Sequence, residues 1–327
     1  MLRHSQPRLL IVRLLVTLFG AALPVAGQAS ISLSYLGTAG WEITDGKTVI
    51  LIDPYISRLK TLTPNDSVLD EDPRPLFSLS DFAKSDTAAI DQRIRHADYI
   101  LITHTHFDHA LDMPYIATKT GATVIGTEST VTFARASGVP NQQLITVKGG
   151  EDYQFSSFSV RVIPSLHGVL RRAPNVPSMR AQSAVAGGPR PTVFPMDVKP
   201  PFRLGDLLIE GGTLAYLVRI GGRQVLAFGS MNFIEREVDG LRPDAALIGA
   251  MPERREIYEY TSRLLNLLGY PGLVLPTHWD RFNVTYEVSQ GPALKRLETF
   301  ISEVKAASPK TQVVVPSYFH PIPVEGK

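Results

Sequence analysis

The chain has 327 residues, of which 44% are hydrophobic and 20% are charged, and its formal net charge is +2 at neutral pH. A chain of this length can bury a large core, and nothing in its composition forces a division into independent domains. It contains no cysteine, which excludes disulfide bonds and a lipid anchor attached through cysteine. Residues 1–29 carry three arginines and no acidic residue, so the remainder has a net charge of −1 (+2 minus 3). Without a global positive field, we expect no nucleic-acid partner.

The first 29 residues are typical of an export signal. Three arginines form a basic start, an apolar stretch follows over residues 14–25, and Gly27 and Ala29 offer small residues for cleavage. The apolar stretch is too short to span a bilayer comfortably. We therefore expect a signal peptide over residues 1–29 and an exported, periplasmic or secreted protein with no stable membrane span after cleavage. An uncleaved anchor is the alternative.

The next part of the chain predicts strands and one helix. Residues 31–52 are strand-like, with turn signals between their apolar runs. A polar connection with prolines follows over residues 57–80, and residues 86–95 predict a short helix capped near Ser85. Residues 97–103 form an apolar run typical of a buried strand.

A histidine cluster follows that strand, with His104, His106 and His109 around Asp108. In an extended segment residues two apart point the same way, so His104 and His106 converge, while a turn at Asp108 and His109 aims a second pair nearby. Imidazole and carboxylate groups are good ligands for zinc-like ions. Because the chain has only 8 histidines, their concentration here predicts a site for one or two such ions.

Beyond the cluster, strands and helices alternate. The predicted helices cover residues 111–120, 127–137, 254–268 and 293–306. The predicted strands cover residues 122–126, 144–147, 153–155, 158–163, 213–220, 223–228, 245–249, 273–275 and 312–315. We expect an antiparallel meander around Gly149-Gly150 and a hairpin at Gly221-Gly222. Interleaved strands and helices, with hairpins in each half, predict two sheets packed together under outer helices.

Residues 171–205 are predicted to form a long, basic, proline-rich insertion loop. Between residues 171 and 201 there are seven prolines and five basic residues against a single acid, Asp197. Loops of this length inside a compact domain are usually functional or disordered. Because the loop follows His167, it is either a solvated insertion or a lid in which Arg171 and Arg172 contact an anionic small-molecule substrate.

The pattern His-x-His-x-Asp-His after a buried strand resembles the signature of the metallo-β-lactamase superfamily. Residues 37–43 and 48–54 are similar to the opening hairpins of that family, and the resemblance covers nearly all of residues 30–327. It implies a single α/β domain, a four-layer αββα sandwich with its metals at one edge between the sheets.

The resemblance also implies a ligand set drawn from several strand ends. One ion would be held by His104, His106 and His167, and the other by Asp108, His109 and His278. By themselves, His167 and His278 are more often ordinary, partly buried histidines, although both follow apolar strands. Asp53 would orient the histidine loop from behind.

One position departs from the family. Many relatives carry an aspartate that bridges the two metals, and Ser230 stands at that place. A neutral hydroxyl binds a divalent cation more weakly than a carboxylate, so we expect the second ion to be looser or held chiefly by a bridging hydroxide. The true β-lactamases with a His-His-His and Asp-His-His ligand set also lack this aspartate. Asn232 is either a second ligand, a hydrogen-bond donor to substrate, or an asparagine that caps a turn.

The resemblance implies a hydrolase that uses Zn2+ as one ion or a pair of ions. A metal-bound hydroxide would cleave an ester, lactone or phosphodiester bond, with Asp108 as ligand and proton acceptor. Three alternatives stay open: cleavage of β-lactam amides, a mononuclear iron redox enzyme on the same fold, and a noncatalytic periplasmic binding or assembly protein, against which the six-ligand set argues. The absence of cysteine excludes the β-lactamase subclasses with a cysteine ligand. Ser230 lies outside a Gly-x-Ser-x-Gly elbow, so we expect no serine acyl-enzyme.

Overall fold

The structure, a computed structural model, describes residues 30–61, 71–169 and 192–324. The expected signal peptide (residues 1–29) and the two arginines Arg171 and Arg172 lie outside these residues. No helix within the described ranges has the length and apolarity needed to cross a membrane.

The first half of the chain and its last strand build a seven-stranded sheet, in the order β14-β1-β2-β3-β4-β5-β6. Its strands are β1 (Ile31–Gly37), β2 (Gly40–Thr44), β3 (Val49–Ile52), β4 (Tyr99–Leu101), β5 (Thr123–Gly126), β6 (Leu144–Thr146) and β14 (Pro321–Val324). From β14 to β3 neighbouring strands are antiparallel, and from β3 to β6 they are parallel. The parallel strands are almost continuously apolar because both faces of this part of the sheet are covered.

The second half builds another seven-stranded sheet, in the order β13-β12-β11-β10-β9-β8-β7. Its strands are β7 (Asp152–Gln154), β8 (Phe158–Ser165), β9 (Thr213–Ile220), β10 (Arg223–Phe228), β11 (Ala245–Gly249), β12 (Leu273–Thr277) and β13 (Gln312–Val313). Neighbouring strands are antiparallel from β7 through β10, and they are parallel from β10 through β13. The hairpin at Gly221-Gly222 is confirmed, with Ile220 paired to Arg223.

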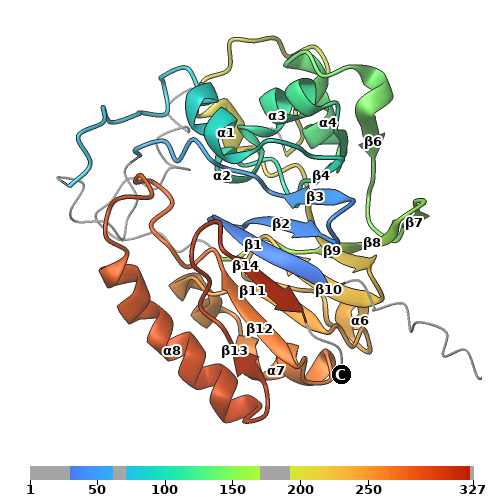
Figure 1. The fold of residues 1–327 in the computed structure, drawn as a ribbon. Helices are drawn as coiled ribbons and strands as arrows, with labels where there is room; N and C mark the ends of the chain where they lie inside the picture. Colours follow the sequence, from blue (N-terminus) through green and yellow to red (C-terminus); the bar gives the residue numbers. More distant parts are fainter. Residues whose placement is uncertain (1–29, 62–70, 170–191, 325–327) are drawn as a thin grey trace, which may run out of the picture.

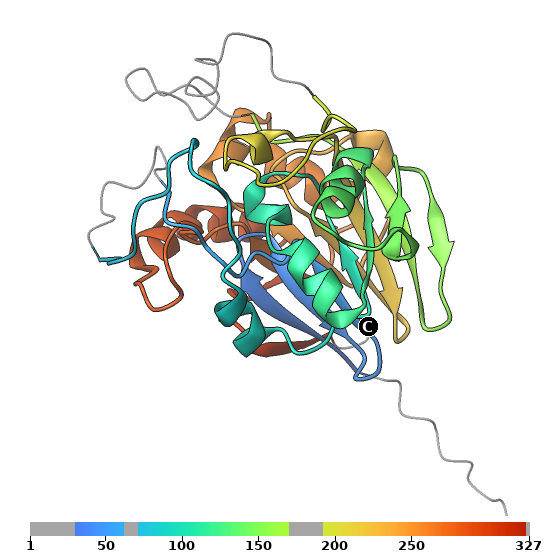
Figure 2. The same cartoon turned by 90° about the horizontal axis from the view of Figure 1, so that it is seen from above.

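Helices cover the outer faces of both sheets, which confirms the predicted αββα sandwich (Figure 1). Over the first sheet lie α1 (Thr87–Arg93), α2 (Phe107–Ala110), α3 (Met113–Thr120) and α4 (Glu128–Ala136), and Figure 2 shows them from above. The second sheet carries α6 (Glu235–Val238), α7 (Tyr260–Leu267) and α8 (Gly291–Ala307). Short 3-10 turns are η1 (Asn141–Gln143), η3 (Asp206–Leu208) and η4 (Pro252–Glu256). Along α8, Ala293, Leu297, Phe300 and Val304 form the buried stripe expected of an amphipathic helix.

The cap predicted near Ser85 is confirmed one residue further on, because the side chain of Asp86 caps α1 by accepting from the backbone N–H of Ala89 at 2.9 Å. Another helix prediction is wrong in detail. The helix predicted over residues 254–268 is interrupted, because Glu259 takes a left-handed backbone conformation (φ 45°) between η4 and α7.

The predicted meander around Gly149-Gly150 is only partly confirmed: β7 and β8 pair antiparallel, but β6 does not pair with β7. Strand β6 belongs to the first sheet and β7 to the second, so the two glycines carry the chain from one sheet to the other. The described end of the insertion loop is not fully solvated either. Phe194 and Phe202 are buried, and both pack against Phe133 of α4.

Strand directions bring several chain segments to one edge of the sandwich. In the first sheet β1, β3 and β4 run in the same direction, and in the second sheet β8, β10 and β12 do so. Segments that follow these strands contact one another across the sheets, because Asp108 lies after β4 and its carboxylate meets His278 after β12. The predicted site residues lie at this edge.

Candidate metal centre

The structure brings the six predicted ligands together in two groups of three. Within each group the ligand atoms lie within 4.8 Å of one another. The first group is His104, His106 and His167, and the second is Asp108, His109 and His278. The groups adjoin, since the ring centroids of His104 and His109 are 3.9 Å apart. Asp108 and His109 lie in the short helix α2 rather than in the expected turn.

In the first group, neutral hydrogen bonds set the direction of two rings. The Thr103 hydroxyl donates to Asp53 (2.5 Å), so its oxygen accepts from Nδ1 of His104 (3.2 Å). Nε2 of His104 therefore carries a lone pair, and it lies 3.2 Å from Nδ1 of His106. Likewise, Nδ1 of His167 donates to the carbonyl of Gly168 (2.9 Å), which leaves Nε2 free to bind.

Burial keeps this group in the form that binds metals. Burial, and then the neighbouring histidines, hold the pKa of His104 well below its ordinary value. Burial also lowers the pKa of His167, against a smaller opposing effect of its own hydrogen bond. Neutral imidazoles are the metal-binding form, so the donor set fits a zinc-like ion.

The second group contains charge. Nδ1 of His109 lies 2.8 Å from Asp53, and Nε2 of His109 and Nε2 of His278 lie 3.7 and 3.2 Å from Oδ2 of Asp108. Burial raises the pKa of Asp108, but His109 and His278 lower it by more, so this carboxylate is ionised. Burial lowers the pKa of His109, yet Asp108 and Asp53 raise it above the ordinary value. A cation is thus favoured between these three side chains.

Asp53 and Thr103 join the two groups from behind. Asp53 is fully buried, and its carboxylate accepts from the Thr103 backbone N–H (2.7 Å), from the Thr103 hydroxyl and from His109. Position 229 must be glycine, because a Cβ there would overlap the Thr103 hydroxyl and lie 2.7 Å from Oδ2 of Asp53. The sequence reasoning identified Asp53 but missed Thr103, although it directly precedes His104.

Ser230 and Asn232 hold the loop that carries His167. The Ser230 hydroxyl accepts from the backbone N–H of Gly168 at 2.9 Å. Nδ2 of Asn232 donates to the carbonyl of His167 at 3.2 Å, and its Oδ1 accepts from the backbone N–H of Phe233 at 2.9 Å. The residue at the place of the family's bridging aspartate is therefore bonded to the backbone of the His167 loop.

Glu210 is a further charged residue beside the first group that the sequence reasoning missed. Its carbonyl accepts from the backbone N–H of Thr105 (2.9 Å), between the first two histidines, and its carboxylate accepts from the hydroxyl of Thr213 (2.7 Å). Its negative charge favours the protonated form of His167. No sequence signal marks a single glutamate of this kind.

Comparison with known proteins finds similarity to the family that the ligand pattern resembles. A family model described as a β-lactamase superfamily domain matches residues 32–182. A UPF0173 metal-dependent hydrolase of Symbiobacterium thermophilum is 25% identical over 277 residues, which cover 83% of this chain and 94% of that protein. Two solved structures share the fold. Igni18, a metallo hydrolase from Ignicoccus hospitalis, is 16% identical with a TM-score of 0.53, over 91% of this chain and 100% of that one. CmlA, a diiron β-hydroxylase from Streptomyces venezuelae, is 17% identical with a TM-score of 0.51, and the match covers 89% of this chain and 54% of CmlA.

Proposed function

Since the chain belongs to the metallo-β-lactamase superfamily and is a metal-dependent hydrolase, we propose that it binds two zinc-like ions and cleaves an ester, lactone or phosphodiester. The observation that carries the proposal is the direction of the ligand atoms. His104, His109 and His167 each bond a protein group through Nδ1, which turns Nε2 toward the other ligands of its group. Bound ions of this kind lower the pKa of water to about 7 and polarise the bond to be cleaved.

The side chains divide the remaining work. Asp108 is ionised and faces both His109 and His278, so it is placed to accept a proton and pass it on during the reaction. The buried Asp53 carboxylate fixes the ring of His109. His167 is only partly buried, and Leu166 and Val169 beside it are 46% and 47% exposed. Substrate therefore approaches from the His167 side, where apolar side chains can contact a non-reacting part of it.

A hydrolysis screen of the zinc-loaded protein tests this function. Chromogenic esters, lactones, phosphodiesters and β-lactams are compared before chelation, after chelation and after zinc is restored. We expect turnover of an ester, lactone or phosphodiester that is lost and regained with the metal. Metal-dependent turnover of β-lactams alone would favour the β-lactamase alternative, and no metal-dependent hydrolysis of any class would contradict the proposal.

The diiron hydroxylase among the structural neighbours motivates one more arm of that screen. The same protein is loaded with iron, and oxygen consumption is measured beside hydrolysis. We expect oxygen consumption no faster than in the metal-free protein. Sustained consumption by the iron form, with no hydrolysis by the zinc form, would establish redox chemistry instead.

We further propose an anionic substrate, on the basis of the basic residues between positions 171 and 205. Replacing Arg171 and Arg172 by glutamine should raise KM for an anionic ester and leave KM for a neutral one nearly unchanged. The reverse change offers a control: Glu210→Gln removes a negative charge beside His167 and should lower KM for the anionic ester. Equal effects on both esters would show that charge does not select the substrate.

Export is proposed from residues 1–29 alone. Cell fractionation with N-terminal sequencing tests it. We expect a chain in the exported fraction that begins near residue 30, whereas a full-length chain in the membrane fraction would establish the uncleaved anchor.

A further inference from the structure

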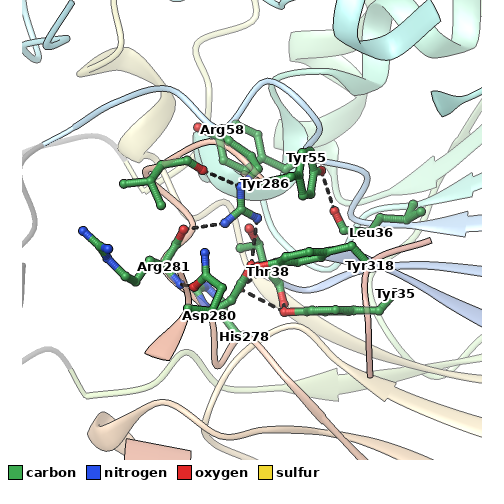
Figure 3. A network of polar contacts seen from close by, with 12 residues as sticks. Tyr35, Leu36, Thr38, Tyr55, Arg58, His278, Asp280, Arg281, Tyr286 and Tyr318 are labelled. Atoms are coloured by element: carbon green, nitrogen blue, oxygen red, sulfur yellow. Dashed lines mark hydrogen bonds and ion pairs between the residues drawn. The ribbon is translucent and has the colours of Figure 1, made fainter. Parts of the chain in front are cut away.

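A buried ion pair lies directly behind His278 (Figure 3). Nη1 of Arg58 is 2.8 Å from Oδ2 of Asp280, and the two side chains are 1% and 0% exposed. The Asp280 carboxylate also accepts from the hydroxyls of Tyr318 (2.7 Å) and Tyr35 (3.0 Å) and from the backbone N–H of Thr38 (3.0 Å). Four donors thus converge on one carboxylate that is not part of either ligand group.

This network controls the backbone that carries His278. The N–H of His278 donates to the carbonyl of Thr38 at 2.5 Å, and the N–H of Thr38 donates to Asp280. Both His278 (φ 51°) and Thr38 (φ 57°) take the left-handed conformation, which is costly for residues other than glycine and persists only where the surroundings enforce it. Arg58 spans the following loop by donating from Nε to the carbonyl of Val284 (2.7 Å) and from Nη2 to that of Arg281.

His278 needs such support more than three of the other histidine ligands do. His104, His109 and His167 each fix their ring through Nδ1, whereas Nδ1 of His278 is buried without a hydrogen-bond partner among the described residues. Its ring direction therefore depends on the backbone and on packing, including the ring of Phe282 at 5.5 Å. An ion pair buried this deeply adds little net stability compared with an apolar pair, so a positioning role is a better reason for it.

We propose that Arg58 and Asp280 are positioning residues for His278. By fixing the left-handed backbone at Thr38 and His278, they hold Nε2 of His278 toward Asp108 and so set the affinity of the second metal ion. This inference rests on the proposed function, because it requires an ion in the second group.

Zinc affinity, measured by competition with a chelator, tests the role. The His167→Ala chain leaves the second group intact, and the His278→Ala chain leaves the first. Arg58→Lys keeps the charge but cannot reach three acceptors at once. In the His167→Ala chain it should weaken zinc binding by about 10- to 100-fold, the range for groups that orient a ligand. In the His278→Ala chain the same change should alter affinity by less than about threefold, because the bonds of Arg58 and Asp280 among the described residues do not go to the first group.

Arg254→Lys is the matched control. Arg254 is also 1% exposed and pairs with a carboxylate, that of Glu303 at 2.8 Å, and its other hydrogen bonds among the described residues go to the carbonyls of Ala250 and Met251 rather than to residues 278–284. It should lower Tm without selectively weakening the second ion. Two outcomes would overturn the proposal and leave Arg58 with a structural role only. In one, Arg58→Lys and Arg254→Lys weaken zinc binding at the second group equally. In the other, Arg58→Lys weakens zinc binding at both groups alike.

A milder variant keeps the proposal testable if Arg58→Lys does not fold. Tyr35→Phe removes the hydroxyl shared by Thr38 and Asp280 but keeps the ring, whose centroid lies 5.6 Å from that of Tyr318. We expect about three- to tenfold weaker zinc binding at the second group only, the loss expected for one or two hydrogen bonds. An unchanged affinity would overturn the positioning role alone, whereas an unaltered protein that binds no second ion would overturn the proposed function together with it.

Discussion

The two ligand groups lie side by side, yet the protein supports them with different chemistry. Around the first group the supporting contacts are neutral: the Thr103 hydroxyl, the Gly168 carbonyl, and the bonds from Ser230 and Asn232 to the His167 loop. Around the second group they are charged. Asp53 bonds His109, and the Arg58–Asp280 pair holds the loop of His278. Neutral hydrogen bonds fix direction at a modest net energy, whereas a buried charge that loses its partner is costly.

The comparison shows where each group should be sensitive. The first group depends on the shape and position of the His167 loop, and the second depends on charges that must stay ionised. Substitutions that remove charge while keeping shape should therefore affect the second group, and substitutions that remove a neutral contact around the first group should affect the first.

The largest expected effect is that of Asp108→Asn, which removes the charge within the second group. We expect kcat to fall by about 10³-fold, because an amide cannot accept the proton and binds metal poorly. Asp112→Asn is the control: Asp112 is another buried aspartate, three residues after His109, and it bonds the backbone of Ile56 and Ser57 instead. More than about a tenth of the original kcat in the Asp108 variant would remove Asp108 from the chemistry.

The next effect is on stability and its pH dependence. Burial raises the pKa of Asp280, but Arg58 and the tyrosine hydroxyls lower it further, so the folded-state pKa is below the ordinary value. The stability from this carboxylate is therefore present above about pH 4 and is lost as the pH falls through the folded-state pKa. Asp280→Asn should lower the free energy of unfolding by about 3 kcal/mol at pH 7.

Denaturant unfolding of the metal-free unaltered protein and of the Asp280→Asn variant, from pH 3 to pH 8, measures the difference between their free energies of unfolding. This difference should stay constant above about pH 5. It should become smaller below about pH 4, because the unaltered protein there loses the stability that the Asp280 carboxylate contributes. A difference that stays the same in acid would show that the charge of Asp280 does not contribute.

Asp53→Asn should have a smaller effect that divides unequally between the groups. Asp53 bonds His109 directly but reaches His104 only through Thr103, so the second ion should weaken by about 10- to 100-fold and the first by less. Asp98→Asn serves as control, because Asp98 accepts from the N–H of Val49 at the opposite end of β3. Chelator competition gives both affinities, and equal losses would contradict the difference between the groups.

The smallest expected effect is that of Ser230→Ala. Loss of the hydrogen bond to Gly168 costs about 1 kcal/mol, so the first ion should bind about fivefold more weakly while the second is unchanged. Weakening confined to the second ion would instead place Ser230 among the groups that contact it.

Local signals in the sequence predicted most elements. The hairpin at Gly221-Gly222 and the strand before His104 were predictable because turn residues and apolar runs act over a few positions. The short strand β14 was missed, since it contains Pro321 and Pro323 and its partner β1 lies almost the whole chain away. The break at Glu259 was missed because apolar spacing continues across it.

The site residues also fall into those that the sequence predicted and those that it did not. A dense histidine motif and a family resemblance were enough to group the six ligands that the structure brings together. Arg58 was not identifiable, because a single arginine in a polar stretch looks solvated and its partner Asp280 is 222 residues away. The hydrogen bond of Ser230 could not be predicted either, because its partner is the backbone N–H of Gly168, in a loop that is distant in the sequence.

The proposed pair of ions is tested most directly by anomalous X-ray diffraction from zinc-loaded crystals, recorded at the zinc absorption edge. We expect two peaks, one about 2.0–2.2 Å from the ligand atoms of His104, His106 and His167 and one at similar distances from those of Asp108, His109 and His278. A crystal of the loaded protein with no peak in either group, or with zinc bound only elsewhere, would contradict the two-ion site.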